Sequence, residues 1–384
     1  MAKLIDITGK ALSGEWGTDD NNGDGIPVLR TTNFTNEGAI NYNDVVTRTI
    51  IKKNIDEKFL RKGDIIIEKS GGSDKFPVGR VVYFDGEGSR YLFNNFTGLL
   101  RVQNQDVWYP RYVFYSLFAN YRRGGTRLFE NKTTGLHNLK INDYVSRYEV
   151  NETDIENQIA ICGKLDKIHA IIKLKVKELQ LLDDLVKTRF VEMFGHSDTN
   201  EKGWKMNTFG DICTVRQGLQ IPISKRLREY DDDCYEYITV QYLHGGKERE
   251  YIKSPKATVI CTKDDILMAR TGNTGLVVTD VEGVFHNNFF LIDFDRNKYD
   301  KDFLVHYLNL DIIQADIIRR AGTSTIPDLN HGEFYKIPVF EPLIGVQRQF
   351  KDFLRQVDKS KAVVQKALDE TQLLFDSLMQ EYFG

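Results

Sequence analysis

Apolar side chains recur every three or four residues along one stretch of the chain, residues 153–195. The stretch contains no proline, and this spacing is typical of a helix that seals one face against another helix. The apolar positions are Leu165, Ile168, Ile172, Val176, Leu179, Leu182, Val186, Phe190 and Met193. At 1.5 Å per residue, about 40 helical residues would form a rod of roughly 60 Å. The pattern therefore predicts a coiled-coil or spacer helix.

A second stretch with the same pattern ends the chain, at residues 345–384. Its apolar positions are Val346, Phe350, Phe353, Val357, Val364, Ala367, Leu374 and Leu378. Both stretches close on Phe-Gly, which makes each the natural partner of the other. Antiparallel packing of the two helices would form a coiled coil with pseudo-twofold symmetry. A structural hinge and a homodimerising coiled coil are the alternative interpretations.

The other residues alternate short strands with turns. Before the first helix, β-branched or aromatic runs at 45–51, 64–68 and 80–84 predict strands, and residues 106–119 predict a turn into an aromatic helix. After it, strands are predicted near 236–240, 258–261, 266–269 and 276–279, and a helix over 302–321. We therefore expect an α+β protein with two α/β domains, at 1–150 and 196–343, separated by long helices at 151–195 and 344–384.

The two strand-rich segments are copies of one another. Matched elements keep their order and stay about 190–200 residues apart, as expected for a duplicated unit. The matches are KGDIIIEKSGGS (62–73) with KDDILMARTGNT (263–274), Asn94-Asn95-Phe96 with Asn287-Asn288-Phe289, residues 133–150 with 323–340, and NQIAICGKLDKI (157–168) with RQFKDFLRQVDKS (348–360).

Composition limits the class of protein. The 384 residues carry a net charge of −3, so any contact with nucleic acid must use locally concentrated positive charge. The chain has no run of about 18 apolar residues and no signal-peptide core at its start, so we expect a cytoplasmic protein with no membrane contact. Four cysteines lie far apart, which predicts neither disulfides nor a structural zinc: Cys162, Cys213, Cys234 and Cys261.

Motifs for catalysis are missing from the sequence. It contains no GxxxxGK[ST] phosphate loop, no GxGxxG after a strand, no HExxH and no Asn/Asp-Pro-Pro-aromatic site. Residues 20–25 resemble the first half of a calcium loop, but the twelfth position is Thr31, so we interpret them as a Gly/Asn/Asp turn. The acid-rich residues 230–237 are interpreted as a solvated turn. We therefore predict no catalytic residue, metal site or cofactor in this chain.

Both copies place cations before a loop rich in glycine and threonine. Arginine and hydroxyl donors suit phosphate oxygens, and arginine can also pair with a guanine edge. A second pair of loops, 70–73 and 270–273, follows a predicted strand in each copy. The alternative is that these are solubilising loops and turn residues. The predicted DNA-binding residues are Ser70, Gly71, Arg122, Arg123, Arg127, Lys132, Thr133, Thr134, Arg216, Lys225, Arg226, Arg270, Thr271, Asn273, Arg319, Arg320, Thr323 and Ser324.

With these segments in this order, the chain resembles the specificity subunit of type I restriction-modification systems over essentially its whole length. The segments that carry the resemblance are GDIIIEKSGG with DDILMARTGNTG, the Asn-Asn-Phe pair, TTGLHNLK with TSTIPDLN, and the helices that end in FVEMFG and EYFG. In that family two target-recognition domains alternate with two long helical spacers. This chain departs from the family pattern in beginning inside the first recognition domain, with almost no preceding spacer segment.

The resemblance implies a non-catalytic protein that reads a bipartite double-stranded DNA site, one domain per half. It implies two adenine-N6 methyltransferase subunits as partners and restriction/translocase subunits bound through them, with S-adenosylmethionine, magnesium and ATP on those partners. Two alternatives remain open: a standalone DNA nuclease or modification enzyme, and a two-headed DNA-binding protein without methyltransferase partners.

Overall fold

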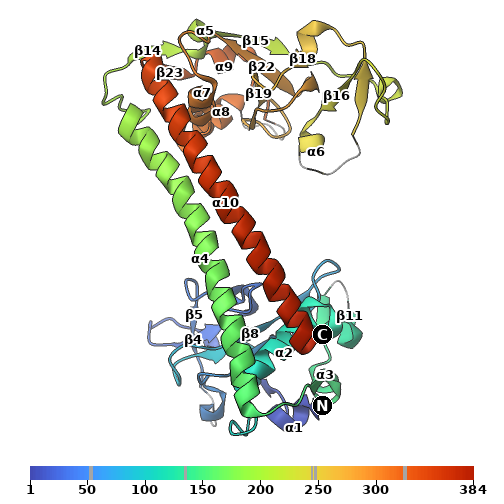
Figure 1. The fold of residues 1–384 in the computed structure, drawn as a ribbon. Helices are drawn as coiled ribbons and strands as arrows, with labels where there is room; N and C mark the ends of the chain where they lie inside the picture. Colours follow the sequence, from blue (N-terminus) through green and yellow to red (C-terminus); the bar gives the residue numbers. More distant parts are fainter. Residues whose placement is uncertain (52–54, 134–135, 244, 246–248, 323–326) are drawn as a thin grey trace. The chain divides into compact units, whose positions relative to one another are not determined.

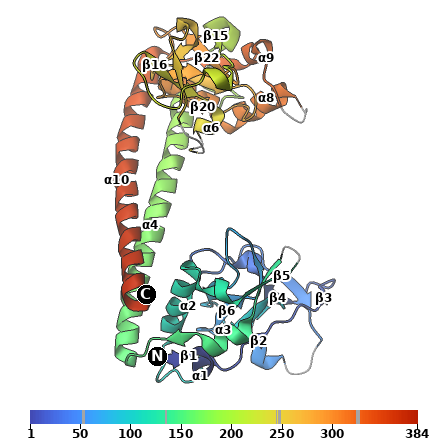
Figure 2. The same ribbon diagram turned by 90° about the vertical axis from the view of Figure 1, so that its right-hand side faces the viewer.

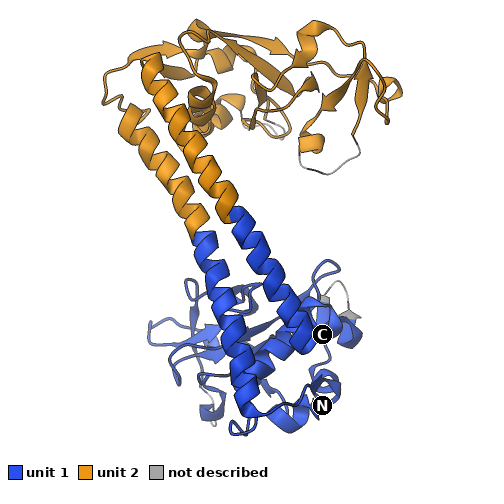
Figure 3. Ribbon diagram, viewed as in Figure 1, with its two compact units in different colours: residues 1–177, 365–384 blue, residues 178–364 orange. Residues whose placement is uncertain are grey.

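The chain divides into two compact units, which Figure 3 colours separately. Unit 1 comprises residues 1–177 and 365–384, and unit 2 comprises residues 178–364. The computed structural model describes residues 1–51, 55–133, 136–243, 245, 249–322 and 327–384. Each unit combines one strand-rich segment with a part of both long helices. The domain boundaries expected after residues 150, 195 and 343 remain predictions.

The two long helices are α4 (Ile155–Phe194) and α10 (Ile344–Phe383), each of 40 residues (Figure 1). Both lie within two residues of the predicted stretches. α4 begins where the Asp154 carboxylate accepts the backbone N–H of Asn157 at 2.9 Å, as an N-cap side chain does. It ends at Gly195, whose φ of +80° is a left-handed conformation that favours glycine.

Within each unit, α4 and α10 pack against each other. In unit 1 the ring centroids of His169 on α4 and Phe375 on α10 are 5.9 Å apart. In unit 2 the centroids of Phe190 on α4 and Phe350 on α10 are 5.4 Å apart. In unit 1, Lys164 of α4 also contacts Tyr382 of α10, and in unit 2, Asp183 of α4 also pairs with Lys361 of α10. In both units a later residue of α4 therefore contacts an earlier residue of α10, so the helices run antiparallel in each unit. The pseudo-twofold relation remains a prediction.

Short strands packed against an aromatic helix make up the rest of unit 1. Its sheets have the strand orders β2-β10-β6-β8, β3-β5-β4-β9, β11-β12-β7 and β1-β13. Helix α2 lies beside α4 and α10 (Figures 1 and 2), and its Tyr112 ring lies 5.0 Å from that of Phe383. The elements are β1 (Ala2–Lys3), α1 (Leu4–Thr8), β2 (Leu12–Ser13), β3 (Thr18–Asp19), β4 (Ile26–Leu29), η1 (Thr31–Asn33), β5 (Val46–Thr49), η2 (Asp56–Lys58), β6 (Ile65–Glu68), β7 (Ser70–Gly72), β8 (Val81–Tyr83), β9 (Leu92–Phe93), β10 (Thr97–Leu100), α2 (Pro110–Arg122), η3 (Gly125–Phe129), β11 (Glu130–Thr133), β12 (Leu136–Leu139), α3 (Ile141–Arg147) and β13 (Glu149–Val150).

Unit 2 has a similar plan. Its sheets have the strand orders β15-β22-β19-β20, β17-β16-β21-β18 and β14-β23. Helix α7 packs on α4 through Phe303, whose ring stacks on that of Phe190 at 5.9 Å. The elements are β14 (Lys205–Thr208), α5 (Phe209–Ile212), β15 (Cys213–Gln217), η4 (Ile223–Lys225), β16 (Cys234–Ile238), α6 (Val240–Leu243), β17 (Tyr251–Lys253), η5 (Ala257–Val259), β18 (Ile260–Cys261), β19 (Ile266–Ala269), β20 (Val277–Val278), β21 (Gly283–Phe285), β22 (Phe289–Phe294), α7 (Lys301–Leu308), α8 (Asp311–Ala321), α9 (His331–Tyr335) and β23 (Pro338–Glu341).

Two predicted elements of unit 2 are divided in the structure. The single helix expected over 302–321 is α7 followed by α8. The break lies at Asn309, whose side-chain Nδ2 donates to the Val305 carbonyl at 2.8 Å and so competes with a continuing helix. The strand expected over 258–261 is a 3₁₀ turn, η5, followed by the two residues of β18.

The sequence repeat is also a repeat of hydrogen bonds. β6 pairs antiparallel with β10 and β8, and β19 pairs antiparallel with β22 and β20. Each unit also contains a parallel pair, β4 with β9 and β16 with β21. Beyond the central strand, the Lys69 carbonyl accepts the N–H of Leu139 at 2.8 Å, and the Arg270 carbonyl accepts that of Leu329 at 2.9 Å. The two copies therefore share one backbone framework.

The register of the Asn-Asn-Phe match differs from the prediction. The backbone N–H of Asn94 donates to the Leu29 carbonyl at 2.9 Å, and that of His286 donates to the Ile238 carbonyl at 2.9 Å. The equivalent of Asn94 is therefore His286, and the predicted pairing with Asn287 is wrong by one residue.

The register of the helix match also differs. The Gln158 side chain accepts the backbone N–H of Tyr109 at 2.8 Å, and the Gln347 side chain accepts that of Asp300 at 2.8 Å. Both glutamines are fully buried. Gln158 therefore corresponds to Gln347, and the predicted pairing with Gln349 is wrong by two residues. In this register the two glutamines lie equally far from the ends of their helices.

Candidate nucleic-acid interface

In each unit, a loop follows the central strand and is fixed by a later segment of chain. In unit 1 the loop continues as β7, where Ser70 pairs with Asn138 of β12. In unit 2 the equivalent Thr271 forms an isolated antiparallel bridge with Asp328. Because backbone pairing with the later segment holds each loop, polar side chains on it keep fixed positions, as recognition loops require.

Arg270 lies at the centre of a polar cluster in unit 2. Its Nε and Nη2 donate to the two carboxylate oxygens of Asp328 at 2.9 and 2.6 Å, and its Nη1 donates to Gln217 Oε1 at 3.2 Å. The same Gln217 oxygen lies 2.8 Å from His331 Nε2. Burial, together with the charge of Arg270, lowers the pKa of His331. The Arg270 side chain is 24% exposed, so its charge reaches solvent in a fixed orientation.

Lys69 holds the place of Arg270 in unit 1. Its Nζ donates to Ser13 Oγ at 3.0 Å. Burial and the nearby charge of Lys58 lower the pKa of Lys69. A phosphate or base oxygen beside this ammonium group would offset both effects, because it favours the charged form. The site is therefore suited to an electronegative ligand.

The predicted residues of unit 1 fall in two places. The first group belongs to the β11-β12-β7 sheet and comprises Ser70, Gly71, Lys132 and Thr133. Arg127, in η3, lies next to this sheet and donates to the carbonyl of Asp74 at 3.1 Å. Thr134 lies outside the described residues.

Arg122 and Arg123 form the second group. Arg122 ends α2, and its Nη1 donates to Asp376 on α10 at 2.7 Å. Arg122 and Arg123 line a cavity of about 220 Å³ against α10, with Met379 and Gln380. These two arginines therefore face α10 rather than the three-stranded sheet.

In unit 2 the predicted residues Arg270, Thr271 and Asn273 share one loop. Arg216, in β15, donates to the carbonyl of Thr258 at 3.1 Å. Arg226 is held by the fold, because it donates to the Ile221 carbonyl and pairs with Glu250 at 2.9 Å. Lys225 precedes it in η4.

The last predicted cations of unit 2 end α8. Arg319 and Arg320 both pair with Asp316, and Arg320 also approaches Glu333 at 3.5 Å. The Arg320 side chain is 16% exposed, whereas that of Arg319 is 69% exposed. Of the two, Arg319 is thus the one that can reach a DNA backbone. Thr323 and Ser324 lie outside the described residues.

Sequence reasoning missed several polar residues of these clusters. Lys69 stands opposite Arg270 in the matched strings, and Asn138 stands opposite Asp328, so the repeat itself contained a signal for both positions. Ser13 and Gln217 come from strands that the repeat did not align. Their place beside the loops follows only from strand pairing in the structure.

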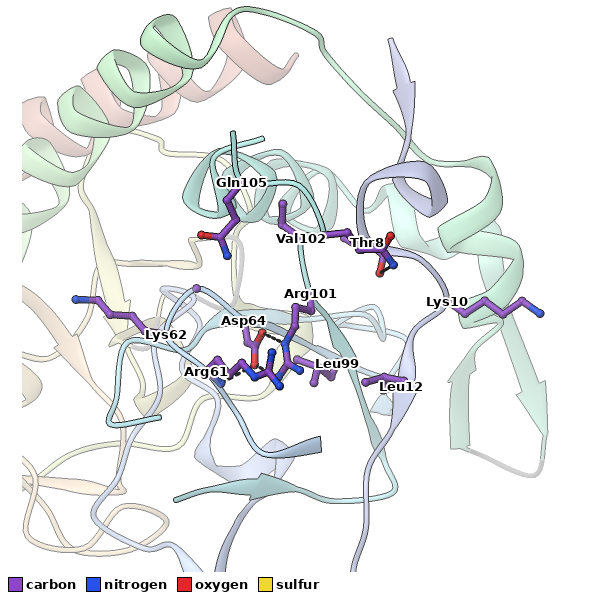
Figure 4. Close-up of a pocket in the computed structure, with 12 residues that line it drawn as sticks. Thr8, Lys10, Leu12, Arg61, Lys62, Asp64, Leu99, Arg101, Val102 and Gln105 are labelled. Atoms are coloured by element: carbon purple, nitrogen blue, oxygen red, sulfur yellow. Dashed lines mark hydrogen bonds and ion pairs between the residues drawn. The ribbon is translucent and has the colours of Figure 1, made fainter. Parts of the chain in front are cut away.

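A cavity of about 450 Å³ in unit 1 also gathers positive charge, with Lys10, Arg61 and Lys62 among its lining residues (Figure 4). Its central cation, Arg101, donates to both carboxylate oxygens of Asp64 at 2.7 Å and to two backbone carbonyls. Asp64 is 2% exposed. This pair serves to fix the start of β6, so the cavity is a weaker candidate than the loop clusters.

The acidic side chains of residues 20–25 and 230–237 form hydrogen bonds and ion pairs with nearby groups. The Asp20 carboxylate accepts the backbone N–H groups of Gly23 and Gly25, at 2.8 and 3.0 Å, which confirms the predicted turn. In the acid-rich segment, Asp231 pairs with Lys253. Over the described part of the chain, no three His, Cys, Asp or Glu side chains gather in a way that could hold a metal ion. None of the described helices has the length and apolar content needed to cross a bilayer.

Comparison with known proteins gives one family. The family model described as "Type I restriction modification DNA specificity domain" matches residues 201–371. No curated protein matches the chain by sequence. The crystal structure of the S subunit of a type I restriction-modification system from M. genitalium covers 100% of this chain and 95% of its own, with a TM-score of 0.59 and 16% identity.

A second solved structure comes from work on complex assembly and conformational transition of the type I R-M system. It covers 100% of this chain and 96% of its own, with a TM-score of 0.59 and 14% identity. At these identities the two neighbours show the fold. The resemblance to type I restriction-modification specificity subunits is therefore confirmed: residues 201–371 match the model of the DNA specificity domain, and the whole chain is similar in fold to S subunits.

Proposed function

We propose that this chain is the sequence-specific DNA-binding subunit of a type I restriction-modification complex, and that each unit reads one half of a bipartite site. The observation that carries the proposal is the duplicated loop framework. The family model covers the second strand-rich segment, and the first segment has the same strand pairing. The loop after the central strand is held by an equivalent backbone hydrogen bond in each, to the carbonyl of Lys69 in the first and of Arg270 in the second. A DNA-reading fold present twice in one chain suits a site made of two halves.

The long helices are proposed to set the gap between the half-sites and to bind two methyltransferase subunits, with restriction/translocase subunits attached through them. Apolar side chains left open to solvent along α4 support a role in protein contact. Ile171 and Leu174 are 44% and 65% exposed, and Leu181 and Leu185 are 55% and 46% exposed. No catalytic group is assigned to this chain, and S-adenosylmethionine, magnesium and ATP are assigned to the partners.

Affinity and base choice are expected to come from different groups. Exposed cations such as Arg319 would contact phosphates and make binding weaker as salt increases. Base choice would come from side chains held rigidly beside the loops, because discrimination requires donors and acceptors in fixed positions.

Mapping of methylated adenines across the host genome, with and without this gene, tests the proposal. Loss of one bipartite motif in the deletion strain is the expected result, and restoration of the gene should restore the motif. An unchanged methylation map would contradict the proposed role.

The alternatives are tested separately. Incubation of the pure protein with DNA and magnesium, with and without the methyl donor, should give neither cleavage nor methylation if the chain acts as a specificity subunit. Activity from this chain alone would favour a standalone enzyme. Purification from the host without a methyltransferase partner would favour a two-headed DNA-binding protein.

A further inference from the structure

Each unit, we propose, discriminates bases through three side chains at the end of its central strand, and the unit 2 cluster reads a guanine through Arg270. The unit 1 cluster comprises Lys69, Ser13 and Asn138. The unit 2 cluster comprises Arg270, Gln217 and Asp328. The inference rests on the proposed function, because it names the groups through which each unit would read its half-site.

The first position of each cluster directly follows the central strand, β6 or β19. The backbone N–H of Lys69 donates to the Phe96 carbonyl at 2.8 Å, and that of Arg270 donates to the Asn288 carbonyl at 2.7 Å. Their own carbonyls accept N–H groups from equivalent residues of the later segment. The two cations therefore project from the same point of the same backbone framework.

The second and third positions are equivalent as well. Ser13 of β2 lies opposite Gly98 of β10, and Gln217 of β15 lies opposite Phe290 of β22. β10 and β22 are the strands that pair with the central strands β6 and β19. The third positions, Asn138 and Asp328, face the loop residue that follows the cation.

The framework is the same in both units, but the chemical groups on it differ. Unit 1 presents an ammonium, a hydroxyl and an amide, and unit 2 presents a guanidinium, an amide and a carboxylate. Base pairs in the major groove differ in the pattern of their donors and acceptors. Two clusters with different patterns on one framework are therefore suited to two half-sites of different sequence.

The contacts of Arg270 favour guanine in particular. A guanidinium has five N–H donors, and three of those of Arg270 are used in bonds to Asp328 and Gln217 among the described residues. Two N–H groups remain, one on Nη1 and one on Nη2, and would donate to guanine O6 and N7, the acceptors with which arginine pairs in the major groove. Because Asp328 and Gln217 already fix the side chain, binding would cost little additional ordering.

The test replaces the host gene with single-residue alleles and maps methylated adenines genome-wide, so that each variant acts in its native complex. Arg270→Ala should lose the preference for guanine at one position of one half-site, by roughly 10- to 100-fold, and leave the gap and the other half unchanged. Arg270→Lys keeps the charge but not the pair of coplanar N–H donors, and should lose most of the same preference. Lys69→Ala should change the base preference in the other half-site, the one that unit 1 would read.

Arg296→Ala is the matched control, because Arg296 contacts Asp265 at the other end of the central strand of unit 2. It removes the same charge and should leave the motif unchanged. Melting temperatures of the purified variants identify loss of folding. If a variant folds but abolishes methylation, its purified complex is used to select binding sites from random duplex DNA. Enrichment of the unit 1 half-motif alone then supports the assignment.

Two outcomes overturn the inference and leave the proposed function intact: a wild-type motif from folded Arg270→Ala protein, and a wild-type half-site for unit 2 that contains no guanine. The first outcome would mean that the Arg270–Asp328 pair only fastens the loop. If deletion of the gene removes no motif at all, the proposed function itself fails, and that result is distinct from either.

Discussion

His306, on α7, is a buried residue whose protonation is linked to the stability of unit 2. Its ring contacts those of Phe190 and Phe350, with centroid distances of 4.7 and 5.2 Å. Its Nε2 is buried and finds no hydrogen-bond partner in the described part of the chain. Burial, with the charges of Lys187 and Lys361, lowers the pKa of His306 to about 4. The folded protein therefore keeps this imidazole neutral.

Unfolding restores an ordinary histidine pKa of about 6.5, so the unfolded chain takes up the proton first as the pH falls. The stabilising effect of this group is complete above pH about 6.5 and is lost as the pH falls toward about 4, by up to about 3 kcal/mol. In His306→Phe this part of the pH dependence should disappear, whereas a change at the exposed His196 should preserve it. Urea unfolding at pH 7.5 and pH 5 gives the loss in free energy of unfolding between the two pH values. If His306→Phe loses as much stability as the wild type, the assignment is contradicted.

At the scale of the element, a buried glutamine fixes the start of each long helix. Besides accepting the N–H of Tyr109, Gln158 donates to the carbonyls of Val107 and Thr153 at 2.9 and 2.8 Å. Gln347 donates likewise to the carbonyls of Lys298 and Pro342, at 2.9 and 2.7 Å. Each glutamine thus satisfies three backbone groups that the helix start would otherwise leave buried and unpaired.

Gln158→Leu should destabilise unit 1, and Gln347→Leu should destabilise unit 2, each by about 3 kcal/mol or more. A leucine fills the space but leaves three backbone groups without partners, at about 1–3 kcal/mol each. Urea unfolding gives the size of the effect, and hydrogen exchange shows in which unit protection is lost. Gln180→Ala, at an exposed site on α4, is the control and should change stability by less than about 0.5 kcal/mol. Equal losses of protection in both units would contradict this local role.

At the scale of the whole molecule, α4 and α10 are the elements shared by both units, because each helix begins in one unit and ends in the other. The division between units falls after Lys177 in α4 and after Val364 in α10. If the helices set the gap in the DNA site, their length should determine that gap.

Four residues inserted after Lys177 and four after Val364 would lengthen both helices by about 6 Å and keep the contacts within each unit in register. The preferred gap should then increase by about two base pairs, at 3.4 Å each, with both half-sequences unchanged. Methylation mapping of the altered allele measures the gap, and Lys177→Ala is the control. An altered half-sequence with the original gap would contradict the spacer role.

Much of the fold was predictable because its signals are local. Helical periodicity placed α4 and α10 within two residues, and short apolar runs located β6 and β19. Prediction failed where a side chain competed with the backbone, as Asn309 does between α7 and α8. It also misaligned two parts of the repeat. The equivalence of Asn94 with His286 lies in hydrogen bonds rather than in residue identity, and Gln158 matches Gln347 and Gln349 equally well by identity, so that only the hydrogen bonds distinguish them.

The sequence by itself determined that the protein is a duplicated unit joined by two long helices, since periodicity and repetition are properties of the chain order. Only the tertiary structure decided which polar groups meet. Arg270 and Asp328 are 58 residues apart, and Gln217 and His331 are 114 apart, so their contacts exist only once the strands have paired. The same folding largely buries the side chains of Arg226 and Arg320 in ion pairs, whereas that of Arg319, which also pairs with Asp316, stays 69% exposed. This difference depends on the tertiary structure and not on the order of the cations in the chain.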